Sequence, residues 1–281
     1  MPELPEVETV ARKLGAEIVG QRIESIEVLW PRTIDRPGLD AFRSQLVRAT
    51  FRAAGRRGKF LILQLDTGWR LLAHLRMSGR FITLGPGAEV DTFQHMRVLL
   101  TFQDRSQLAF VDPRKFGRLY LVRDIEEIVG KLGPEPLGGS FTADWLHRGL
   151  AGRRGEIKRL LLDQRFIAGL GNIYASEILW RAGIHPQRIA GSLDVCECER
   201  LHEAVVTVLR KAIREGGTSL DDRQYTYPNG KIGGYQEHLQ VYDRGGETCP
   251  RCGYILTRIV QGQRSTYYCP VCQPPQAKRS T

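Results

Sequence analysis

The sequence lacks the features that mark membrane and secreted proteins. No apolar run approaches the ~20 residues that a membrane-spanning helix needs. The first ten residues, MPELPEVETV, contain three acids and no basic residue, whereas a secretory signal begins with basic residues followed by an apolar stretch. These absences favour a cytoplasmic protein that has no membrane partner.

Lysine is scarce in an otherwise basic composition. The 281 residues include 41 basic and 31 acidic side chains, a formal net charge of +10, yet only eight of the bases are lysine. A basic surface favours polyanions, and nucleic acid is the first candidate, although such a charge is also compatible with general solubility. With so few lysines, one that lies in a suggestive motif is a candidate functional residue.

Hydrophobic periodicity predicts a strand-rich first half. Residues 2–19 predict a helix, because Pro2 suits a first turn and the apolar residues share one face. Closely spaced strands without intervening helices are then expected at 23–30, 60–66, 69–84, 96–102, 107–112 and 118–122. This arrangement is typical of antiparallel β layers.

The second half is predicted to be helical. The Pro- and Gly-rich stretch 131–140 predicts a domain linker. Helices are expected beyond it at 142–149, 155–163, 173–182 and 194–215. A Gly-rich polar stretch follows at 216–234, and a short strand is expected at 237–243. The length suits two domains, each large enough to bury a core.

Four of the six cysteines form two pairs near the C-terminus. Cys249 and Cys252 form one C-x2-C pair, Cys269 and Cys272 form another, and sixteen residues separate the pairs. In a chain without a secretion signal, this spacing predicts one tetrahedral zinc ion rather than disulfides. Four protein ligands leave no open position, so the zinc is expected to be structural. The other two cysteines are expected to be free thiols.

Pro2 would become the N-terminal residue on removal of the initiator methionine, which a small second residue permits. An α-amino group has a pKa of ~8, against ~10 for lysine, so more of it is unprotonated at neutral pH. A secondary amine that attacks a sugar C1′ forms an iminium, which is an electron sink for elimination. Glu3 and Glu6 flank the amine and are candidate proton carriers. Without further information, the simpler interpretation is a helix start whose acids match the helix dipole.

At residues 2–9, PELPEVET, the sequence resembles the formamidopyrimidine-DNA glycosylase family, bacterial enzymes that repair oxidised purines. The resemblance covers essentially the whole chain and includes the cysteine pairs. Its further motifs follow in the order of the family: GKF at 58–60, HLRMSG at 74–79, DPRKFG at 112–117, GLGNIYASEI at 169–178, GGTS at 216–219, HLQVY at 238–242 and QRST at 263–266.

The resemblance implies an α+β multidomain fold. An N-terminal antiparallel β-sandwich with flanking helices would occupy residues 1–133. A helix–two-turn–helix domain would occupy 134–236, a zinc finger 237–274 and a tail 275–281. The family holds damaged double-stranded DNA between its domains and acts as a monomer in the bacterial cytoplasm, at the nucleoid.

The resemblance also implies catalytic roles for four residues. Pro2 matches the nucleophile that forms a Schiff base, and Glu3 matches the proton donor. Lys59 matches the lysine assigned to β-elimination. Arg264 matches the arginine assigned to δ-elimination, although by itself it is most simply an exposed arginine near a hairpin tip.

The DNA contacts of the family match a further set of residues. His95, Arg114, Lys158 and Asn172 match its phosphate and base contacts, and His74 and Tyr242 lie in matching motifs. Met77, Arg114 and Phe116 match the wedge that fills the stack when a base is turned out of the duplex. Without the motif, core packing would be the natural interpretation of Met77 and Phe116.

Two alternatives compete with this interpretation. An endonuclease VIII-like enzyme shares the architecture but prefers oxidised pyrimidines, and its N-terminus typically begins PEGPE, where this chain has Leu4. A non-catalytic DNA-binding protein built on a zinc ribbon would not need the four catalytic residues together. The choice of lesion is expected to depend on the loop 216–234, in which Thr218 and Ser219 lie, and on Tyr235.

Overall fold

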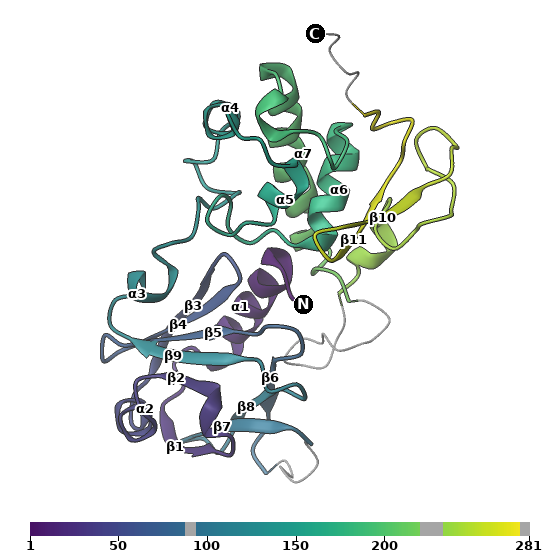
Figure 1. Cartoon of the computed structure of the whole chain (residues 1–281). Helices are drawn as coiled ribbons and strands as arrows, with labels where there is room; N and C mark the ends of the chain where they lie inside the picture. The colour runs from purple at the N-terminus through teal and green to yellow at the C-terminus, as the bar shows by residue number, and fades with distance from the viewer. Residues whose placement is uncertain (88–93, 220–232, 276–281) are drawn as a thin grey trace. The chain divides into compact units, whose positions relative to one another are not determined.

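The computed structural model describes residues 1–87, 94–219 and 233–275 (Figure 1). The chain forms two compact units. The first unit comprises residues 1–131 and 215–236, and the second comprises 132–214 and 237–281. The three-domain division drawn from the sequence stays a prediction, and the structure groups 215–236 with the first unit. None of the helices in the described ranges has the length and apolar content that crossing a bilayer requires.

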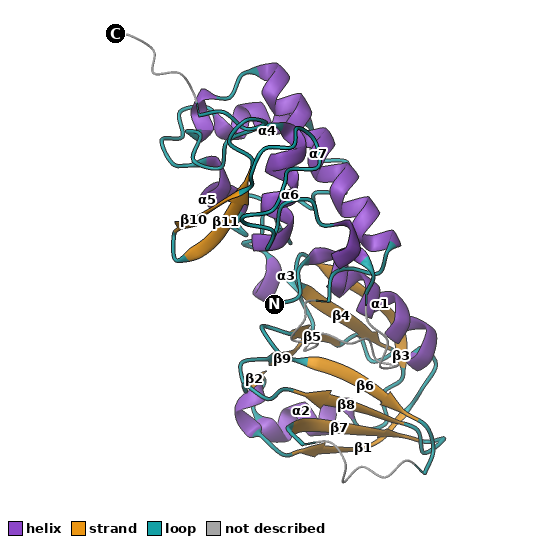
Figure 2. Ribbon diagram, turned by 90° about the vertical axis from the view of Figure 1, so that its right-hand side faces the viewer, coloured by secondary structure: helices purple, strands orange, loops and turns teal. Residues whose placement is uncertain are grey.

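The first unit is built on two sheets, which Figure 2 shows as separate layers. One sheet has the strand order β1-β7-β8-β6 and the other the order β2-β9-β5-β4-β3. The strands are β1 (Ile23–Val28), β2 (Ile34–Arg36), β3 (Phe51–Arg57), β4 (Phe60–Leu65), β5 (Arg70–His74), β6 (Arg80–Leu84), β7 (Met96–Phe102), β8 (Gln107–Val111) and β9 (Arg118–Val122). All neighbours pair antiparallel except β2 and β9. The expected antiparallel sandwich is confirmed.

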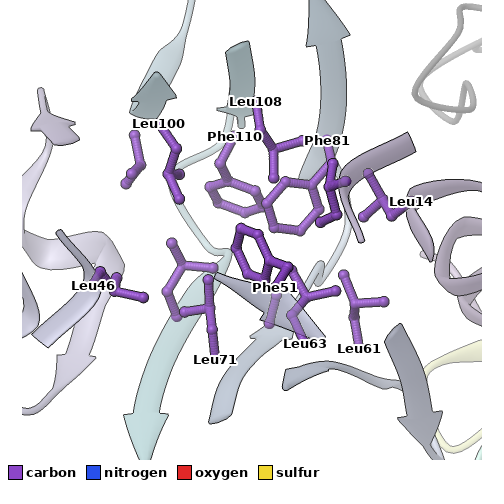
Figure 3. Packing of buried hydrophobic residues seen from close by; sticks show 14 of the residues in the cluster. Leu14, Leu46, Phe51, Leu61, Leu63, Leu71, Phe81, Leu100, Leu108 and Phe110 are labelled. Carbon is purple, nitrogen blue, oxygen red and sulfur yellow. The ribbon is translucent and has the colours of Figure 1, made fainter. Parts of the chain in front are cut away.

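The core of the first unit lies between the sheets (Figure 3). Phe81 and Phe110 come from the four-stranded sheet and approach with ring centroids 5.1 Å apart. Phe51 and Leu63 face them from the five-stranded sheet and are fully buried. Side chains that alternate along each strand therefore fill the space between the layers, as in other β-sandwiches.

Among its described residues the first unit has the helices α1 (Leu4–Ile18), α2 (Leu39–Leu46) and α3 (Glu126–Val129), of which α1 packs on β3 and β4 and α2 on β1 and β2. The predicted helix 2–19 corresponds to α1, whose apolar face includes Val7, Leu14 and Ile18, all buried. The sequence did not predict α2, because only Phe42 and Leu46 mark its buried face. Such a short amphipathic segment gives little periodic signal.

Two strand predictions were wrong. The expected strand 69–84 is two strands, β5 and β6, separated by a turn at 75–79. Arg76 has a φ of 56°, a left-handed conformation that no strand residue adopts. The expected strand 237–243 is a 3₁₀ turn, η4 (Tyr235–His238), followed by further turns.

The second unit packs helices against a small hairpin. The helices are α4 (Ala143–Leu150), α5 (Ile157–Leu161), α6 (Asn172–Ala182) and α7 (Val195–Arg214), and the hairpin strands are β10 (Thr257–Gln261) and β11 (Arg264–Tyr268). The pair α6 and α7 and the pair α4 and α7 pack together, and α6 also contacts β11. The predicted helical second half is confirmed, with boundaries shifted by a few residues.

A pair of phenylalanines tests which aromatic rings hold the first unit together. Phe51 is fully buried between the sheets, whereas Phe116 is 54% exposed. Phe51→Ala is expected to lower the free energy of unfolding by about 3–5 kcal/mol, because burial is lost and a cavity remains. Phe116→Ala is expected to change it by less than about 0.5 kcal/mol. Urea unfolding followed by far-UV circular dichroism measures both, and equal losses would contradict this packing.

Candidate functional site

Pro2 and Glu3 are buried at the start of α1. Glu3 is the N-cap residue and is only 2% exposed, while Met1 in front of Pro2 is 44% exposed. The backbone N–H of Glu3 donates to Glu6 Oε2 at 2.7 Å, as in a capping box. The predicted nucleophile and proton donor therefore lie in a defined, largely dry environment at the positive end of a helix.

Glu6 also holds a segment that is distant in sequence. Its Oε1 accepts the backbone N–H of Thr218 at 2.7 Å. Gly217 has a φ of 79°, and a Cβ there would lie 2.7 Å from Glu6 Oε1, so this close approach requires glycine. Thr218 is buried. The carboxylate of Glu6 thus joins the start of α1 to the beginning of the predicted lesion loop.

The two ends of that loop are hydrogen-bonded to each other. The N–H of Tyr235 donates to Gly217 O at 3.0 Å, and the N–H of Gly233 donates to Ser219 Oγ at 3.0 Å. Ser219 N donates in turn to Gln236 Oε1 at 3.1 Å. Residues 220–232 of the loop lie outside the described ranges. The two described ends of the loop are therefore hydrogen-bonded to each other next to Glu6.

Lys59 and His74 lie near each other in sequence register at one end of the five-stranded sheet, where His74 of β5 pairs with Phe60, the residue after Lys59. Lys59 follows Gly58 in the turn between β3 and β4 and is 6% exposed. Burial, with the positive charges of Arg76 and Lys59, lowers the pKa of His74 to about 3. The Nδ1 of His74 accepts the backbone N–H of Arg76 at 3.1 Å. A neutral imidazole in this arrangement carries its proton on Nε2.

The predicted wedge residues lie on two loops of the first unit. Met77 is 45% exposed and Phe116 54% exposed, which excludes core packing for both. A guanidinium nitrogen of Arg114, Nη1, lies 3.5 Å from Met77 Sδ. His95 is also exposed, and its carbonyl accepts the N–H of Asp112 at 3.0 Å. The backbones of two of these residues, His95 and Arg114, are hydrogen-bonded to the buried residue Asp112.

Lys158 and Asn172 form a cluster in the second unit. The ammonium of Lys158 is buried and donates to Asn172 Oδ1 at 2.9 Å, Ser265 O at 3.2 Å and Thr266 Oγ1 at 2.7 Å. Asn172 Nδ2 donates to Ser265 O at 2.9 Å. Lys158 thereby fixes the amide of Asn172 beside the strand that begins with Arg264. A direct contact between Lys158 and DNA stays a prediction.

Arg264 is exposed at the tip of the zinc-finger hairpin. It pairs with Gln261 across a two-residue turn, in which Gly262 and Gln263 both have positive φ. Such turns match the twist of the flanking strands and present the next side chain at the tip. The expected position of Arg264 near a hairpin tip is confirmed.

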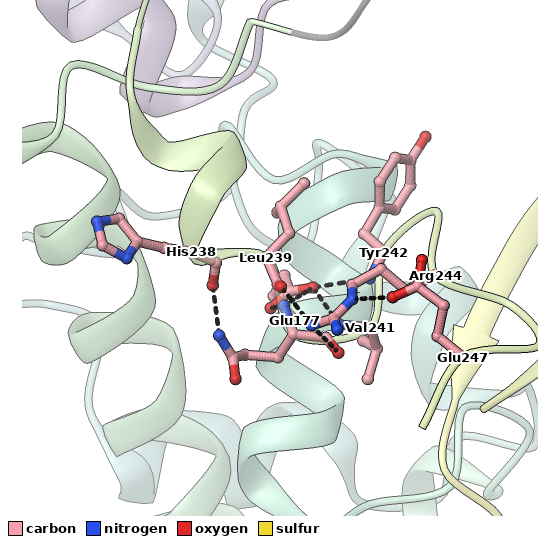
Figure 4. Close-up of polar contacts among 8 residues, drawn as sticks. Glu177, His238, Leu239, Val241, Tyr242, Arg244 and Glu247 are labelled. Carbon is pink, nitrogen blue, oxygen red and sulfur yellow. Dashed lines mark hydrogen bonds and ion pairs between the residues drawn. The ribbon is translucent and has the colours of Figure 1, made fainter. Parts of the chain in front are cut away.

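Glu177 places Tyr242 relative to α6 (Figure 4). Its carboxylate accepts the backbone N–H groups of Gln240 at 3.0 Å, Val241 at 2.9 Å and Tyr242 at 2.8 Å. Burial raises the pKa of Glu177, although these three donors act in the opposite direction. The N–H groups of 240–242 bind a side chain rather than a strand, which explains why the predicted strand 237–243 does not form.

A basic cavity of about 460 Å³ lies in the second unit, next to α5. Arg153, Arg154 and Arg159 line it, together with Glu156 and Asp163 among others. These arginines carry no motif in the sequence, because arginine is common throughout the chain. Three guanidinium groups around one cavity are suited to an anionic ligand.

The four paired cysteines converge on one point. Their sulfur atoms all lie within 4.8 Å of one another. The Cys249 and Cys272 sulfurs are 3.9 Å apart, and those of Cys252 and Cys269 are 3.5 Å apart. Tetrahedral zinc with Zn–S bonds of ~2.3 Å separates sulfurs by about 3.8 Å. The cysteines fit one zinc ion, which would join the two knuckles on either side of the β10–β11 hairpin.

The comparisons with known proteins cover nearly the whole chain. Residues 1–119 match the model of the formamidopyrimidine-DNA glycosylase N-terminal domain, 132–224 that of its H2TH domain, and 246–275 a zinc finger found in FPG and IleRS. A formamidopyrimidine-DNA glycosylase of Chloroflexus aggregans is 46% identical over 276 residues, which are 97% of this chain and 98% of that protein.

Solved structures agree with these matches. A complex of Lactococcus lactis Fpg with DNA that contains an abasic site has a TM-score of 0.89 and 38% identity, and it covers 97% of this chain and 99% of that one. A complex of the wild-type L. lactis protein with DNA that contains N7-benzyl-Fapy-dG has a TM-score of 0.90 and 38% identity, covering 97% and 100%.

Metal analysis tests the cysteine site. We expect one zinc per chain, and we expect Cys249→Ser to lose zinc and duplex binding together, because a hairpin this small has little core without its metal. Cys196→Ser is the matched control, since this exposed thiol lies on α7, outside the cluster. Elemental analysis and fluorescence anisotropy with duplex DNA measure the two properties. Full DNA affinity in the metal-free variant would refute a structural role.

Proposed function

The chain belongs to the formamidopyrimidine-DNA glycosylase family, and on this premise we propose the reaction it carries out and the residues that perform it. The protein is a base-excision repair enzyme that removes oxidised purines from duplex DNA, and it also cleaves the resulting abasic strand. It acts as a monomer on damaged double-stranded DNA. The proposed location is the bacterial cytoplasm, at the nucleoid, where this substrate is found.

The buried start of α1 is the observation that supports this chemistry most directly. Pro2 and Glu3 are both buried there, and the carboxylate of Glu6 accepts the backbone N–H of Glu3. After removal of Met1, the nitrogen of Pro2 is a secondary amine at the positive end of α1. The helix dipole disfavours a positive charge there and so favours the unprotonated, nucleophilic form.

The first chemical step replaces the glycosidic bond with a bond to Pro2. The Pro2 nitrogen attacks C1′ of the damaged nucleotide, and the base leaves with a proton that Glu3 supplies. The bond between C1′ and O4′ then breaks, the hydrogen on the Pro2 nitrogen is transferred to O4′, and the nitrogen lone pair forms an iminium with C1′. This cation withdraws electrons from C2′ and makes its hydrogen acidic, which prepares the strand for elimination.

Lys59 and Arg264 are assigned to the elimination steps. Loss of a C2′ proton expels the 3′ phosphate, which is β-elimination, and Lys59 is the proposed group for this step. Expulsion of the 5′ phosphate follows as δ-elimination, which we assign to Arg264. The exposed position of Arg264 at a rigid two-residue turn suits a guanidinium that meets a phosphate.

The remaining site residues are proposed to hold the DNA. Asn172 and Tyr242 would contact phosphates, and the cluster around Lys158 would keep Asn172 in place. His74 would donate from Nε2 as a neutral group, which makes its contact independent of pH over the physiological range. His95 and Arg114 lie at the exposed side of the wedge loops. Such contacts fix the position of the duplex without reading its sequence.

The lesion class is proposed to depend on the loop whose base is held by Glu6. Oxidation of guanine at C8 adds an N7–H donor and a C8 oxygen but leaves the pairing edge largely intact. Undamaged guanine has no hydrogen on N7, so a buried acceptor directed at this position would have no hydrogen-bond donor when undamaged guanine is bound. Thr218, Ser219 and Tyr235 are buried at the described base of this loop. Backbone carbonyls of the segment that starts and ends at these residues are the proposed source of the acceptor.

A comparison of the protein with and without Met1 tests whether the Pro2 nitrogen is the nucleophile. Retaining Met1 is expected to abolish covalent trapping by borohydride on abasic DNA, because the Pro2 nitrogen is then an amide, while duplex binding stays measurable. A protein with Met1 removed and Pro2 intact is the control. Undiminished trapping with Met1 retained would exclude Pro2 as the nucleophile.

Competition between lesions tests the substrate class. Matched duplexes with 8-oxoguanine opposite cytosine, 8-oxoguanine opposite adenine, or thymine glycol are expected to be processed in that order of decreasing rate. Slower excision opposite adenine is expected because Arg114 can hydrogen-bond the edge of an unpaired cytosine. Single-turnover kinetics on each duplex provide the measurement. Faster release of thymine glycol would favour a preference for oxidised pyrimidines.

A further inference from the structure

We propose that Asp112 is a positioning residue that assembles the DNA wedge before DNA arrives. The inference rests on the proposed function, because the wedge has a purpose only in an enzyme that turns a base out of duplex DNA. It assigns a role to a side chain that is 1% exposed and therefore cannot itself contact the duplex. The wedge residues Met77, Arg114 and Phe116 lie on the two loops that Asp112 joins.

The carboxylate of Asp112 uses both of its oxygens. Oδ1 accepts the hydroxyl of Ser78 at 2.5 Å and the backbone N–H of Arg114 at 3.2 Å. Oδ2 accepts the backbone N–H of Gly117 at 2.7 Å. Ser78 belongs to the turn between β5 and β6, whereas Arg114 and Gly117 belong to the loop between β8 and β9. One buried side chain therefore fastens two loops that are more than thirty residues apart.

The backbone of Asp112 is held as firmly as its side chain. Its carbonyl accepts Arg97 Nε at 2.8 Å, and its N–H donates to the carbonyl of His95 at 3.0 Å. Arg97 lies on β7 and is itself buried. Asp112 is thus anchored to the four-stranded sheet, and the loops it binds are fixed relative to that sheet.

Gly117 and Ser78 show that the two loops are fitted closely around the carboxylate. A Cβ at Gly117 would lie 2.6 Å from the ring of Phe110 and 3.1 Å from Asp112 Oδ2, so only glycine permits this approach. The hydroxyl of Ser78 is within 3.3 Å of the N–H of Arg114, which it can accept while it donates to Asp112. Backbone and short polar groups of both loops therefore meet at this carboxylate.

The exposed wedge residues therefore lie on loops whose backbones are hydrogen-bonded to a buried carboxylate. Met77 and Phe116 are large apolar side chains exposed to solvent, an arrangement that usually marks a binding surface. Arg114 already contacts Met77 through Nη1 and Sδ, 3.5 Å apart. Side chains that are ordered before binding lose less entropy on insertion into the base stack. Asp112 supplies that order through the backbone of both loops.

An amide replaces the carboxylate only in part. In Asp112→Asn, one oxygen becomes an NH2 group, which must face either the N–H of Gly117 or the pair formed by Ser78 and Arg114. In the first case the buried N–H of Gly117 loses its acceptor; in the second the hydroxyl of Ser78 loses its acceptor and the N–H of Arg114 keeps only Ser78 Oγ, 3.3 Å away. Because such a loss weakens the arrangement of the wedge, we expect excision of 8-oxoguanine from a duplex to slow roughly tenfold to hundredfold.

The experiment separates the wedge from the chemistry of Pro2. Duplexes carry 8-oxoguanine with 2-aminopurine next to the opposite cytosine, and fluorescence reports the opening of the stack during single-turnover excision. In parallel, borohydride trapping is measured on an abasic site in single-stranded DNA, which needs no wedge. Asp112→Asn is expected to reduce the fluorescence change and the excision rate, while single-strand trapping stays within about twofold of the parent protein.

Two further variants make the result specific. Asp66→Asn is the matched control, because Asp66 Oδ1 also accepts a backbone N–H, from Thr50 at 2.9 Å, at a turn far in sequence from the wedge loops. It is expected to leave both readouts unchanged. Ser78→Ala removes one of the three hydrogen bonds and is expected to give an intermediate effect. The double variant of Ser78 and Asp112 is expected to be no worse than Asp112→Asn alone, because the two share one interaction.

Three outcomes decide the matter. A normal fluorescence change and normal excision in Asp112→Asn would overturn the proposal. An equal loss of single-strand trapping would also overturn it, because the role of Asp112 would then be general stability rather than positioning. Failure of the parent protein to trap abasic DNA at all would instead refute the proposed function, which distinguishes the two hypotheses.

Discussion

Buried carboxylates that accept backbone N–H groups from loops are the interaction on which the site depends. Glu6 accepts the N–H groups of Glu3 and Thr218, and Glu177 accepts three successive N–H groups at 240–242. Asp112 does the same for the wedge loops. A carboxylate has several acceptor positions and no hydrogen, so one side chain can satisfy several loop donors that water would otherwise bind. Removing it leaves those donors buried without acceptors, which costs about 1–3 kcal/mol each.

Much of the architecture could be predicted from the sequence, because its signals are local. The apolar face of α1 repeats with the helical period, and short strands without intervening helices indicated the sandwich. The four cysteines have a spacing that only a metal site readily explains, and their sulfurs do converge. The motifs of the family also placed Met77 and Phe116 at the surface, where hydrophobicity alone would have buried them.

The parts that the sequence did not reveal involve partners far apart along the chain. Glu177 lies in the middle of the largely buried helix α6, and its acceptor role depends on a turn more than sixty residues later. The same contact explains why 237–243 is not a strand. Asp112 follows directly on a buried strand, where an acid next to proline suggests only a turn. Hydrophobic periodicity cannot show such contacts, because it describes each segment separately.

The hydrogen bond between Glu6 and Thr218 spans 212 residues, and this separation constrains the order in which a growing chain can complete its structure. Residues 1–131 leave the ribosome first, but their compact unit also includes 215–236. Glu6 Oε1 therefore has no donor from Thr218 until the entire helical region from α4 to α7 has been synthesised. Neither unit corresponds to one continuous segment, so a truncation after residue 131 would release a sandwich without the partner of its own Glu6. The start of α1, to which we assign the nucleophile, is therefore synthesised before the segment that completes its hydrogen bonds.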